Sequence, residues 1–140
     1  MNEIRVLLQA NLENVSVARG IISSFLSNED VTVNVFNEIK TIVSEAITNA
    51  IVHGYQNDSS KFVSFNCILR SNVLFIEIKD DGVGIDDIEK AKEPLYTSLA
   101  SEERAGLGFT IMEIFSDNLE VESKLGEGTI LRIEKKLKMN

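Results

Sequence analysis

Three polar side chains recur at every fourth residue of one predicted helix. Glu45, Asn49 and His53 occur in the stretch VSEAITNAIVHGY. Positions i, i+4 and i+8 of an α-helix lie along one face, so these side chains are expected to share a face. A carboxylate, an amide and an imidazole placed together can bind a divalent metal ion and phosphate groups. The spacing therefore predicts a metal and phosphate site.

Each of the three residues also has an ordinary structural interpretation. Glutamate and asparagine are common on the solvated face of a helix. His53 precedes Gly54, a residue well placed to end the helix in the left-handed conformation. An imidazole at that position also suits the negative end of the helix dipole. Taken alone, the three residues are compatible with an ordinary solvated helix surface.

Three glycine-bearing segments come later in the chain: DDGVG at 80–84, GLGF at 106–109 and GEGT at 126–129. Glycine allows a sharp turn and a close approach of the backbone to a ligand. Asp80 stands where a predicted strand meets the first turn. Its carboxylate can accept a hydrogen bond, and the exocyclic amine of adenine is one candidate donor. Alone, the same pattern is a common hairpin or loop sequence.

The second and third segments have two interpretations each. GLGF at 106–109 opens a predicted helix, whose free backbone N–H groups would form an anion site, although glycine-rich helix starts are frequent. GEGT at 126–129 is either a plain hairpin turn or a segment that brings the Thr129 hydroxyl close to a nucleotide base. Neither segment is a Walker loop, because G-x-x-x-x-G-K-[ST] does not occur in the chain.

The elements that must position these residues are predicted from apolar periodicity. In order, they are a strand at 3–9, helices at about 14–27 and 35–52, hairpin strands at 62–69 and 73–79, a helix at 107–116, and strands at about 118–124 and 129–137. Asn14 is the predicted N-cap of the first helix, and Ser71-Asn72 is the predicted hairpin turn.

A long connection separates the hairpin from the last helix. Residues 80–105 include a predicted short helix near 87–92 and the only proline, Pro94. A connection of this length is usually functional or mobile. Repeated βαβ units are absent, so the order of elements predicts one domain over 1–140 with a two-layer α/β sandwich fold. Its sheet is expected to be mixed and mostly antiparallel, with helices on one face.

Composition narrows the class of partner. The 140 residues include 22 acidic and 14 basic side chains, a formal net charge of −8, which argues against a general nucleic-acid binder but not against ATP. Apolar runs are too short to span a membrane, and the N-terminal residues show no signal-peptide pattern. Cys67 is the only cysteine, so no disulfide within the chain is expected, and a cytoplasmic location fits.

The motifs occur in a meaningful order: E-x-x-x-N-x-x-x-H-G-Y, then D-x-G-x-G, G-x-G and G-x-G-T. This arrangement resembles the GHKL ATPase superfamily, which includes gyrase B and histidine kinases, and it implies a Bergerat-type nucleotide site. The resemblance implies that Asn49 ligates Mg²⁺, Asp80 binds adenine and Thr129 assists adenine recognition. The further positions that it implies for the site and its lid are Gly82, Gly84, Gly106, Leu107 and Gly108.

Nearly the whole chain is similar to the sporulation anti-sigma F factors of endospore-forming bacteria. The resemblance rests on IKTIVSEAITNAIVHGYQN, on KEPLYTSLASEERAGLGFTIMEIF and on total length. It implies a homodimeric protein that inhibits a sigma factor and uses ATP to phosphorylate a serine of an anti-anti-sigma protein. Glu45 is then the candidate general base, with a structural or water-positioning role as the alternative. Arg104 is a candidate phosphate-sensing or partner-docking residue, and His53 a nucleotide contact only.

Other functions stay open at this point. A stress-response kinase of the same family would differ in partner and not in chemistry. The isolated ATPase domain of a histidine kinase is a second alternative, although no helical hairpin with a phosphoacceptor histidine is seen. A module that binds ATP without turnover is a third, and Glu45 beside Asn49 counts against it. A lid that distinguishes ATP from ADP would select between partners.

Overall fold

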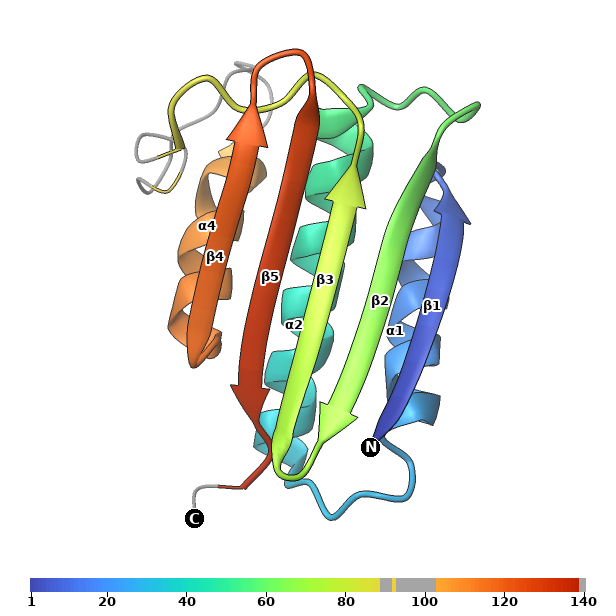
Figure 1. The fold of residues 1–140 in the computed structure, drawn as a ribbon, viewed down its shortest axis with the longest axis vertical. Helices are drawn as coiled ribbons and strands as arrows, with labels where there is room; N and C mark the ends of the chain where they lie inside the picture. Colours follow the sequence, from blue (N-terminus) through green and yellow to red (C-terminus); the bar gives the residue numbers. More distant parts are fainter. Residues whose placement is uncertain (89–91, 93–102, 139–140) are drawn as a thin grey trace.

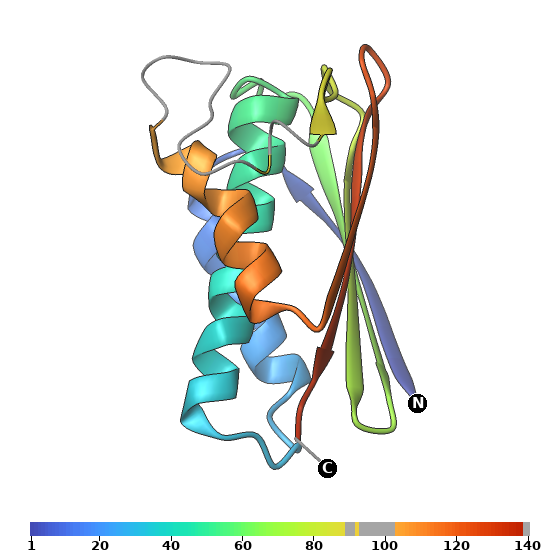
Figure 2. The ribbon, with the colours of Figure 1, turned by 90° about the vertical axis from the view of Figure 1, so that its left-hand side faces the viewer.

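Five strands form one sheet, and helices α1, α2 and α4 cover the same face of it (Figures 1 and 2). The computed structural model describes residues 1–88, 92 and 103–138, with side chains from residue 108 onward in the last segment. The elements are β1 (Asn2–Gln9), α1 (Glu13–Phe25), α2 (Val33–Asn49), η1 (Ala50–Gly54), β2 (Phe62–Arg70), β3 (Val73–Asp80), α4 (Glu103–Phe115), β4 (Asn118–Lys124) and β5 (Gly128–Lys136). This order confirms the predicted two-layer sandwich.

The sheet has the spatial order β1-β2-β3-β5-β4, and each neighbouring pair is antiparallel. The sequence predicts a mixed, mostly antiparallel sheet; among the described strands no parallel pair occurs. The central strand β3 pairs with β5 in a register that places Asp80 directly opposite Thr129. Two residues that are far apart in the sequence therefore lie side by side at one end of the sheet.

The hydrophobic core lies between the sheet and the helices (Figure 2). Side chains alternate between the two faces of a strand, so every second residue of β2 and β3 points into this layer. The fully buried ones are Val63, Phe65, Cys67, Leu74, Ile76 and Ile78. From α2 the core receives Ile39, Ile42, Val43, Ala46 and Ile47. Burial of this apolar stripe sets the rotation of α2 and leaves Glu45 and Asn49 half-buried beside it.

Polar side chains stabilise the first turns of α1 and α2, but at α1 this side chain is not the predicted Asn14. The Thr32 hydroxyl caps α2, because its oxygen accepts a hydrogen bond from the Val35 N–H at 3.2 Å. At α1 the side chain that performs this role is Asn11, whose Oδ1 accepts from the Glu13 N–H at 3.1 Å. Asn14 lies in the first turn and donates to the Gln9 carbonyl at 2.9 Å, so its prediction as N-cap is wrong.

The last helix begins earlier than predicted. Helix α4 starts at Glu103 and not at 107, so Gly106 and Gly108 lie inside its first turns. Glu, Arg and Ala at 103–105 are good helix formers, which accounts for the extension. In the connection before it, the Lys92 N–H donates to the Ile88 carbonyl at 3.2 Å, as the short helix predicted near 87–92 requires. Residues 89–91 and Pro94 lie outside the described residues.

None of the described helices combines the length and the apolar character that crossing a membrane requires. The Cys67 thiol is fully buried under the helices, and burial raises its pKa to about 12. Because the thiolate is the reactive form, this cysteine is a core residue and not a nucleophile.

Candidate functional site

Glu45 and Asn49 lie one turn apart on α2, and α2 packs against α4. Gly108 of α4 approaches so closely that a Cβ atom at this position would lie 3.1 Å from the Glu45 Oε2 atom. A side chain at position 108 would therefore compete with the carboxylate for space. The structure thus places the Glu45 carboxylate beside the glycine backbone of α4, with Asn49 one turn further along α2.

The helix ends in a π-helical turn, η1, which carries His53. Its i→i+5 bond runs from the Tyr55 N–H to the Ala50 carbonyl at 2.9 Å. A π turn holds more residues than an α turn, so the spacing of four residues between Asn49 and His53 no longer corresponds to one α-helical turn. The shared face of Glu45, Asn49 and His53 therefore stays a prediction for His53, which lies at the end of the same helix.

Asp80, the last residue of β3, is a buried carboxylate that is only 5% exposed. The Gly82 N–H donates to its Oδ1 atom at 2.9 Å. Burial raises the pKa of the carboxyl from 3.8 to about 6; the hydrogen bond from Gly82 opposes this shift, and the neighbouring Asp81 charge adds to it. At neutral pH the site therefore holds an ionised, poorly hydrated acceptor, which attracts a hydrogen-bond donor strongly.

Two glycines make room for this carboxylate. A Cβ atom on Gly54 would lie 2.5 Å from the Asp80 Cγ atom, and one on Gly82 would lie 1.9 Å from the Gly54 carbonyl oxygen. The same carbonyl accepts a hydrogen bond from the Val83 N–H at 2.9 Å. The sequence predicts that Gly54 ends the helix with positive φ, but the positive φ values occur at Gln56 (53°) and Asn57 (63°). Gly54 is needed for lack of space and not for its conformation.

The first and third glycine segments form one unit with the end of β3. Gly84 has φ +77°, and a Cβ atom there would lie 2.2 Å from the Lys124 carbonyl oxygen. Gly128 has φ +97°, and its Cβ atom would lie 2.1 Å from the Asp80 carbonyl oxygen. The Gly126 N–H donates to the Val83 carbonyl at 2.7 Å. Only glycine is compatible with these contacts, so both segments are more than ordinary turns.

Thr129 belongs to a small hydroxyl network beside Asp80. Its Oγ1 atom lies 2.8 Å from the Ser123 Oγ atom, and Thr129 is only 6% exposed. Ser123 Oγ also accepts a hydrogen bond from the Ile85 N–H at 2.8 Å, which holds the loop after the first glycine segment. Sequence reasoning missed Ser123, because a serine in a strand with alternating polarity carries no signal of its own.

The predicted residues thus form two groups. Asp80, Gly82, Gly84 and Thr129 lie together at the end of the sheet, while Glu45 of α2 lies beside Gly108 of α4 and Asn49 follows one turn later on α2. Gly54 lies nine positions after Glu45, which corresponds to about 13 Å along an α-helix. The backbones of Arg104, Gly106 and Leu107 belong to α4, and their side-chain roles lie outside the described residues.

The donor set fits a magnesium ion that arrives with phosphate groups. Among the described residues there is no cluster of three His, Cys, Asp or Glu side chains that could hold a metal ion. Mg²⁺ typically uses one or two protein oxygen ligands and completes its shell with water and substrate phosphates. The Asn49 amide oxygen, one turn from the Glu45 carboxylate, would be a ligand of this kind.

Replacing Gly54 with alanine tests the close packing around Asp80. The added methyl group overlaps the Asp80 carboxyl, so we expect the free energy of unfolding to fall by about 1–3 kcal/mol. Gly20→Ala is the matched control: no atom lies within 4 Å of its Cβ position in α1, and helix propensity predicts a gain of up to about 1 kcal/mol. Urea denaturation measures both. Equal stability of Gly54→Ala and the wild type would contradict the packing argument.

Comparison with known proteins places these motifs in a family. A model of the histidine kinase-like ATPase domain matches residues 8–135. The anti-sigma F factor of Geobacillus kaustophilus is 46% identical over 134 residues, which cover 96% of this chain and 92% of that protein. The anti-sigma F factor of Clostridium perfringens strain SM101 is 44% identical over 136 residues, which cover 97% of each protein.

Solved structures show the same fold at lower sequence identity. The crystal structure of the RsbU and RsbW domains of a Mycobacterium tuberculosis protein aligns over 98% of this chain and 33% of its own, with a TM-score of 0.69 and 15% identity. A blue-light activated histidine kinase of Erythrobacter litoralis aligns over 89% of this chain and 41% of its own, with a TM-score of 0.59 and 23% identity. These two likenesses concern the fold alone.

The family model spans most of the chain, and the relatives match it almost from end to end. An ATPase domain is one that binds ATP, which agrees with a site built from a buried acceptor, close glycine backbones and a half-buried glutamate. The chain belongs to the anti-sigma F factors, within the histidine kinase-like ATPase domain family.

Proposed function

We propose that the chain is an ATP-dependent protein serine kinase that also binds and inhibits a sigma factor of the sigma F type. Its phosphoacceptor is a serine of an anti-anti-sigma protein. One observation carries the kinase part of the proposal: the Glu45 carboxylate lies against the Gly108 backbone, one turn from the Asn49 amide. The names of the similar proteins support the sigma-factor part and favour the sporulation branch over the stress-response branch.

The adenine base binds at the end of the sheet in this proposal. The ionised Asp80 carboxylate accepts a hydrogen bond from the exocyclic amine, and the Thr129 hydroxyl lies on the neighbouring strand beside it. Guanine carries a carbonyl oxygen where adenine carries the amine, so it would place an acceptor against a buried carboxylate. The site therefore selects adenine nucleotides by charge and by hydrogen bonding.

The phosphates lie between α2 and α4, where Asn49 would hold Mg²⁺. The metal supplies charge neutralisation for the phosphate oxygens. The serine Oγ bonds to the γ-phosphorus while the bond to the β-phosphate oxygen breaks, so ADP leaves. Glu45 accepts the proton from the serine hydroxyl. Glycine at position 108 leaves the space beside this carboxylate free of a side chain, because a Cβ atom there would lie 3.1 Å from the Glu45 Oε2 atom.

The histidine-kinase alternative finds no support at His53. This is the only histidine of the chain, it is half-buried at the end of the nucleotide helix, and its Nε2 atom is buried. A phosphoacceptor nitrogen must be reached by the γ-phosphorus of ATP from outside. A phosphorylated intermediate on this residue is therefore not part of the proposal.

Phosphate transfer with labelled ATP tests the kinase activity. The protein is incubated with Mg²⁺, ATP labelled at the γ-phosphate and a purified anti-anti-sigma protein of a spore-forming bacterium. We expect the label on one serine of the acceptor, identified by mass spectrometry, and no acid-labile label on the protein itself. Release of the label only as free phosphate would contradict the kinase proposal and leave an ATPase.

Co-purification with a sigma factor tests the inhibitor activity separately. A tagged sigma F protein is mixed with the chain in Mg-ATP, in Mg-ADP or without nucleotide. We expect a complex in Mg-ATP and a weaker one in Mg-ADP, because partner choice requires different contacts in the two states. Equal affinities would contradict nucleotide control of partner choice, and no complex in any condition would contradict the sigma-factor part.

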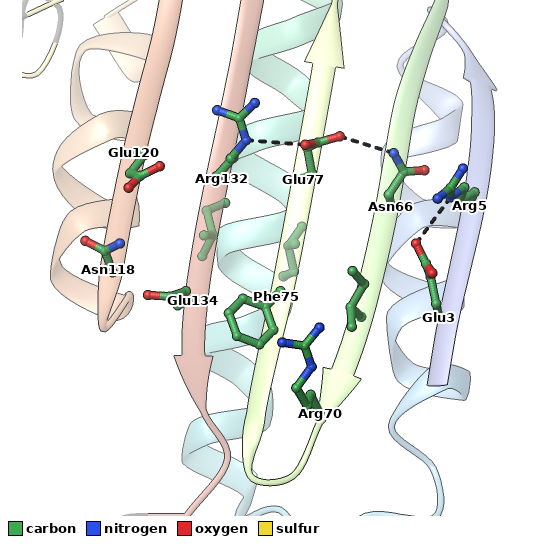
Figure 3. A pocket seen from close by; sticks show the side chains of 13 residues that line it. Glu3, Arg5, Asn66, Arg70, Phe75, Glu77, Asn118, Glu120, Arg132 and Glu134 are labelled. Atoms are coloured by element: carbon green, nitrogen blue, oxygen red, sulfur yellow. Dashed lines mark hydrogen bonds and ion pairs between the residues drawn. The ribbon is translucent and has the colours of Figure 1, made fainter. Parts of the chain in front are cut away.

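The proposed assembly is a homodimer, and the outer face of the sheet, away from the helices, is its proposed interface (Figures 2 and 3). This face has a hollow of 570 Å³. The hollow is lined by Glu3, Arg5, Asn66, Ile68, Arg70, Phe75, Ile76, Glu77, Asn118, Glu120, Arg132, Ile133 and Glu134. Figure 3 shows acidic and basic side chains on neighbouring strands of this face, including Arg132 and Glu77, which form an ion pair at 3.4 Å.

The charge and size of this face favour a second copy as its partner. The chain as a whole carries −8, whereas arginines and glutamates nearly balance on the outer face. A face that carries both positive and negative charges can be complementary to the same face of a second copy in a twofold dimer. Five strands of about eight residues cover roughly 24 by 27 Å, or about 650 Å², close to the roughly 800 Å² per partner of a typical interface.

Phe75→Glu tests this interface. Phe75 is half-buried on the outer face of the central strand, so a charge there should disrupt a dimer and leave the fold intact. Ile114→Glu is the control, because Ile114 is 71% exposed on α4. We expect light scattering to give twice 15.6 kDa for the wild type and the control, and 15.6 kDa for Phe75→Glu. A folded, dimeric Phe75→Glu protein would contradict this interface.

A further inference from the structure

One buried hydroxyl group joins three segments around the proposed adenine site. Tyr55 directly follows η1 and is only 8% exposed. Its hydroxyl group donates a hydrogen bond to the Phe62 carbonyl oxygen at 2.8 Å and accepts one from the Asp81 N–H at 2.8 Å. These two hydrogen bonds connect the C-terminal end of α2 and η1 to the start of β2 and to the end of β3.

These bonds act on the turn that carries Asp80. The Asp81 N–H belongs to the peptide that follows Asp80, so its bond to Tyr55 sets the orientation of that peptide plane. Two residues later, the Val83 N–H donates to the Gly54 carbonyl at 2.9 Å. Between these two anchors the Gly82 N–H donates to the Asp80 Oδ1 atom. The position of the carboxylate thus depends on anchors at the end of the helix.

The hydroxyl group must stay protonated to make both bonds. A phenol can donate one hydrogen bond and accept another at the same time, whereas a phenolate can only accept. Burial raises the pKa of Tyr55 above its usual value of 10.0, and the Asp81 and Asp80 charges act in the same direction, against the hydrogen bond from Asp81. Both bonds are therefore retained throughout the physiological pH range.

We propose that Tyr55 is a positioning residue for nucleotide selectivity: its hydroxyl group holds the Asp80 turn in the geometry that distinguishes adenine from guanine. Tyr55 does not touch the base itself and acts through the Asp81 amide. The inference rests on the proposed role of Asp80 as the adenine acceptor. It gives a role to the tyrosine that ends the E-x-x-x-N-x-x-x-H-G-Y motif.

Tyr55→Phe is the direct test, because phenylalanine keeps the ring and removes only the hydroxyl group. We expect ATP affinity to fall by at least about tenfold while the weak affinity for GTP stays within about twofold, so the ATP to GTP preference decreases. Isothermal titration with each Mg-nucleotide measures the ratio. Exchange of the Asp81 amide hydrogen, followed by NMR, should become faster in the variant, which reports the lost bond directly.

Thr32→Ala is the matched control. It also removes a hydroxyl oxygen that accepts from a backbone N–H, at the opposite end of α2 from the site. We expect a comparable loss of thermal stability and an unchanged ATP to GTP ratio. An unchanged ratio in Tyr55→Phe would overturn the inference. An equal fall of the ratio in Thr32→Ala would also overturn it, because stability alone would then account for the effect.

Asp80→Asn distinguishes a failure of the proposed role of Tyr55 from a failure of the proposed adenine site. If Asp80→Asn loses ATP affinity and Tyr55→Phe does not, the adenine site stands and the role of Tyr55 is refuted. If neither variant alters the ATP to GTP ratio, the proposed adenine acceptor is itself refuted. All titrations are made at a temperature where circular dichroism shows each variant to be fully folded.

Discussion

Glu45→Gln is expected to slow transfer of phosphate to the acceptor serine by at least about 100-fold and to leave Mg-ATP affinity within about threefold. Glutamine has nearly the same shape as glutamate but cannot accept the serine proton, and a general base typically contributes 10²–10⁴-fold to a rate. Single-turnover transfer from labelled ATP measures the rate, and isothermal titration measures the affinity. A loss of transfer without a loss of binding assigns the proton-acceptor role to Glu45.

Glu38→Gln is the matched control for this variant. Glu38 lies on the same helix but pairs with Lys135 at 2.9 Å, two turns away from Glu45. We expect its rate of transfer to equal that of the wild type. If Glu45→Gln transfers phosphate at the wild-type rate, the residue is not the base. If it loses ATP binding as well, its role is structural, which is the alternative that the sequence leaves open.

Asp80→Asn is expected to stabilise the nucleotide-free protein at neutral pH. The pKa of Asp80 is about 6 in the folded state, whereas an unperturbed aspartate has a pKa of 3.8. The folded state therefore holds the proton more tightly than the unfolded state. Ionisation of this buried carboxyl therefore lowers stability as pH rises from about 4 to above 6. Two pKa units correspond to about 3 kcal/mol as an upper value. The asparagine variant is neutral at every pH and avoids this loss.

The difference between Asp80→Asn and the wild type should depend on pH. Urea denaturation is expected to show the variant as more stable by about 1–3 kcal/mol at pH 7.5, and the difference should disappear near pH 4. Asp86→Asn removes an exposed carboxylate from the connection that follows β3. We expect this variant to change stability little at either pH. A difference that stays constant with pH would contradict the raised pKa of Asp80.

Much of this architecture could be predicted, because local sequence patterns determine the helices, the strands and the hairpin turn. The apolar period of α2 predicts which side faces the core, and the strands at 62–69 and 73–79 agree with β2 and β3 to within a residue. The turn at Ser71-Asn72 is confirmed, with φ +54° at Ser71. These features depend on residues that are neighbours in the sequence, so propensity and periodicity suffice.

The remaining features depend on contacts between distant segments. Gly54 has no room for a side chain because Asp80, 26 positions later, occupies that space, and a helix pattern does not contain this information. The helix ends in a π turn whose last residue, Gly54, accepts a hydrogen bond from the Val83 N–H of the turn after Asp80. Ser123 and Tyr55 act through hydrogen bonds whose partners come from other strands and loops. Such residues are recognised only once the fold brings their partners together.

Titration of Mg-ATP into the wild type and Asp80→Asn at pH 7.5 tests the central claim most directly. The amide introduced by Asp80→Asn can accept from the Gly82 N–H only with its oxygen, which turns its own N–H groups toward the adenine amine, so two donors face each other. We predict one ATP per chain for the wild type and for Asp86→Asn, and at least a hundredfold weaker binding for Asp80→Asn. Wild-type affinity in a folded Asp80→Asn protein would contradict the claim that this buried carboxylate recognises ATP.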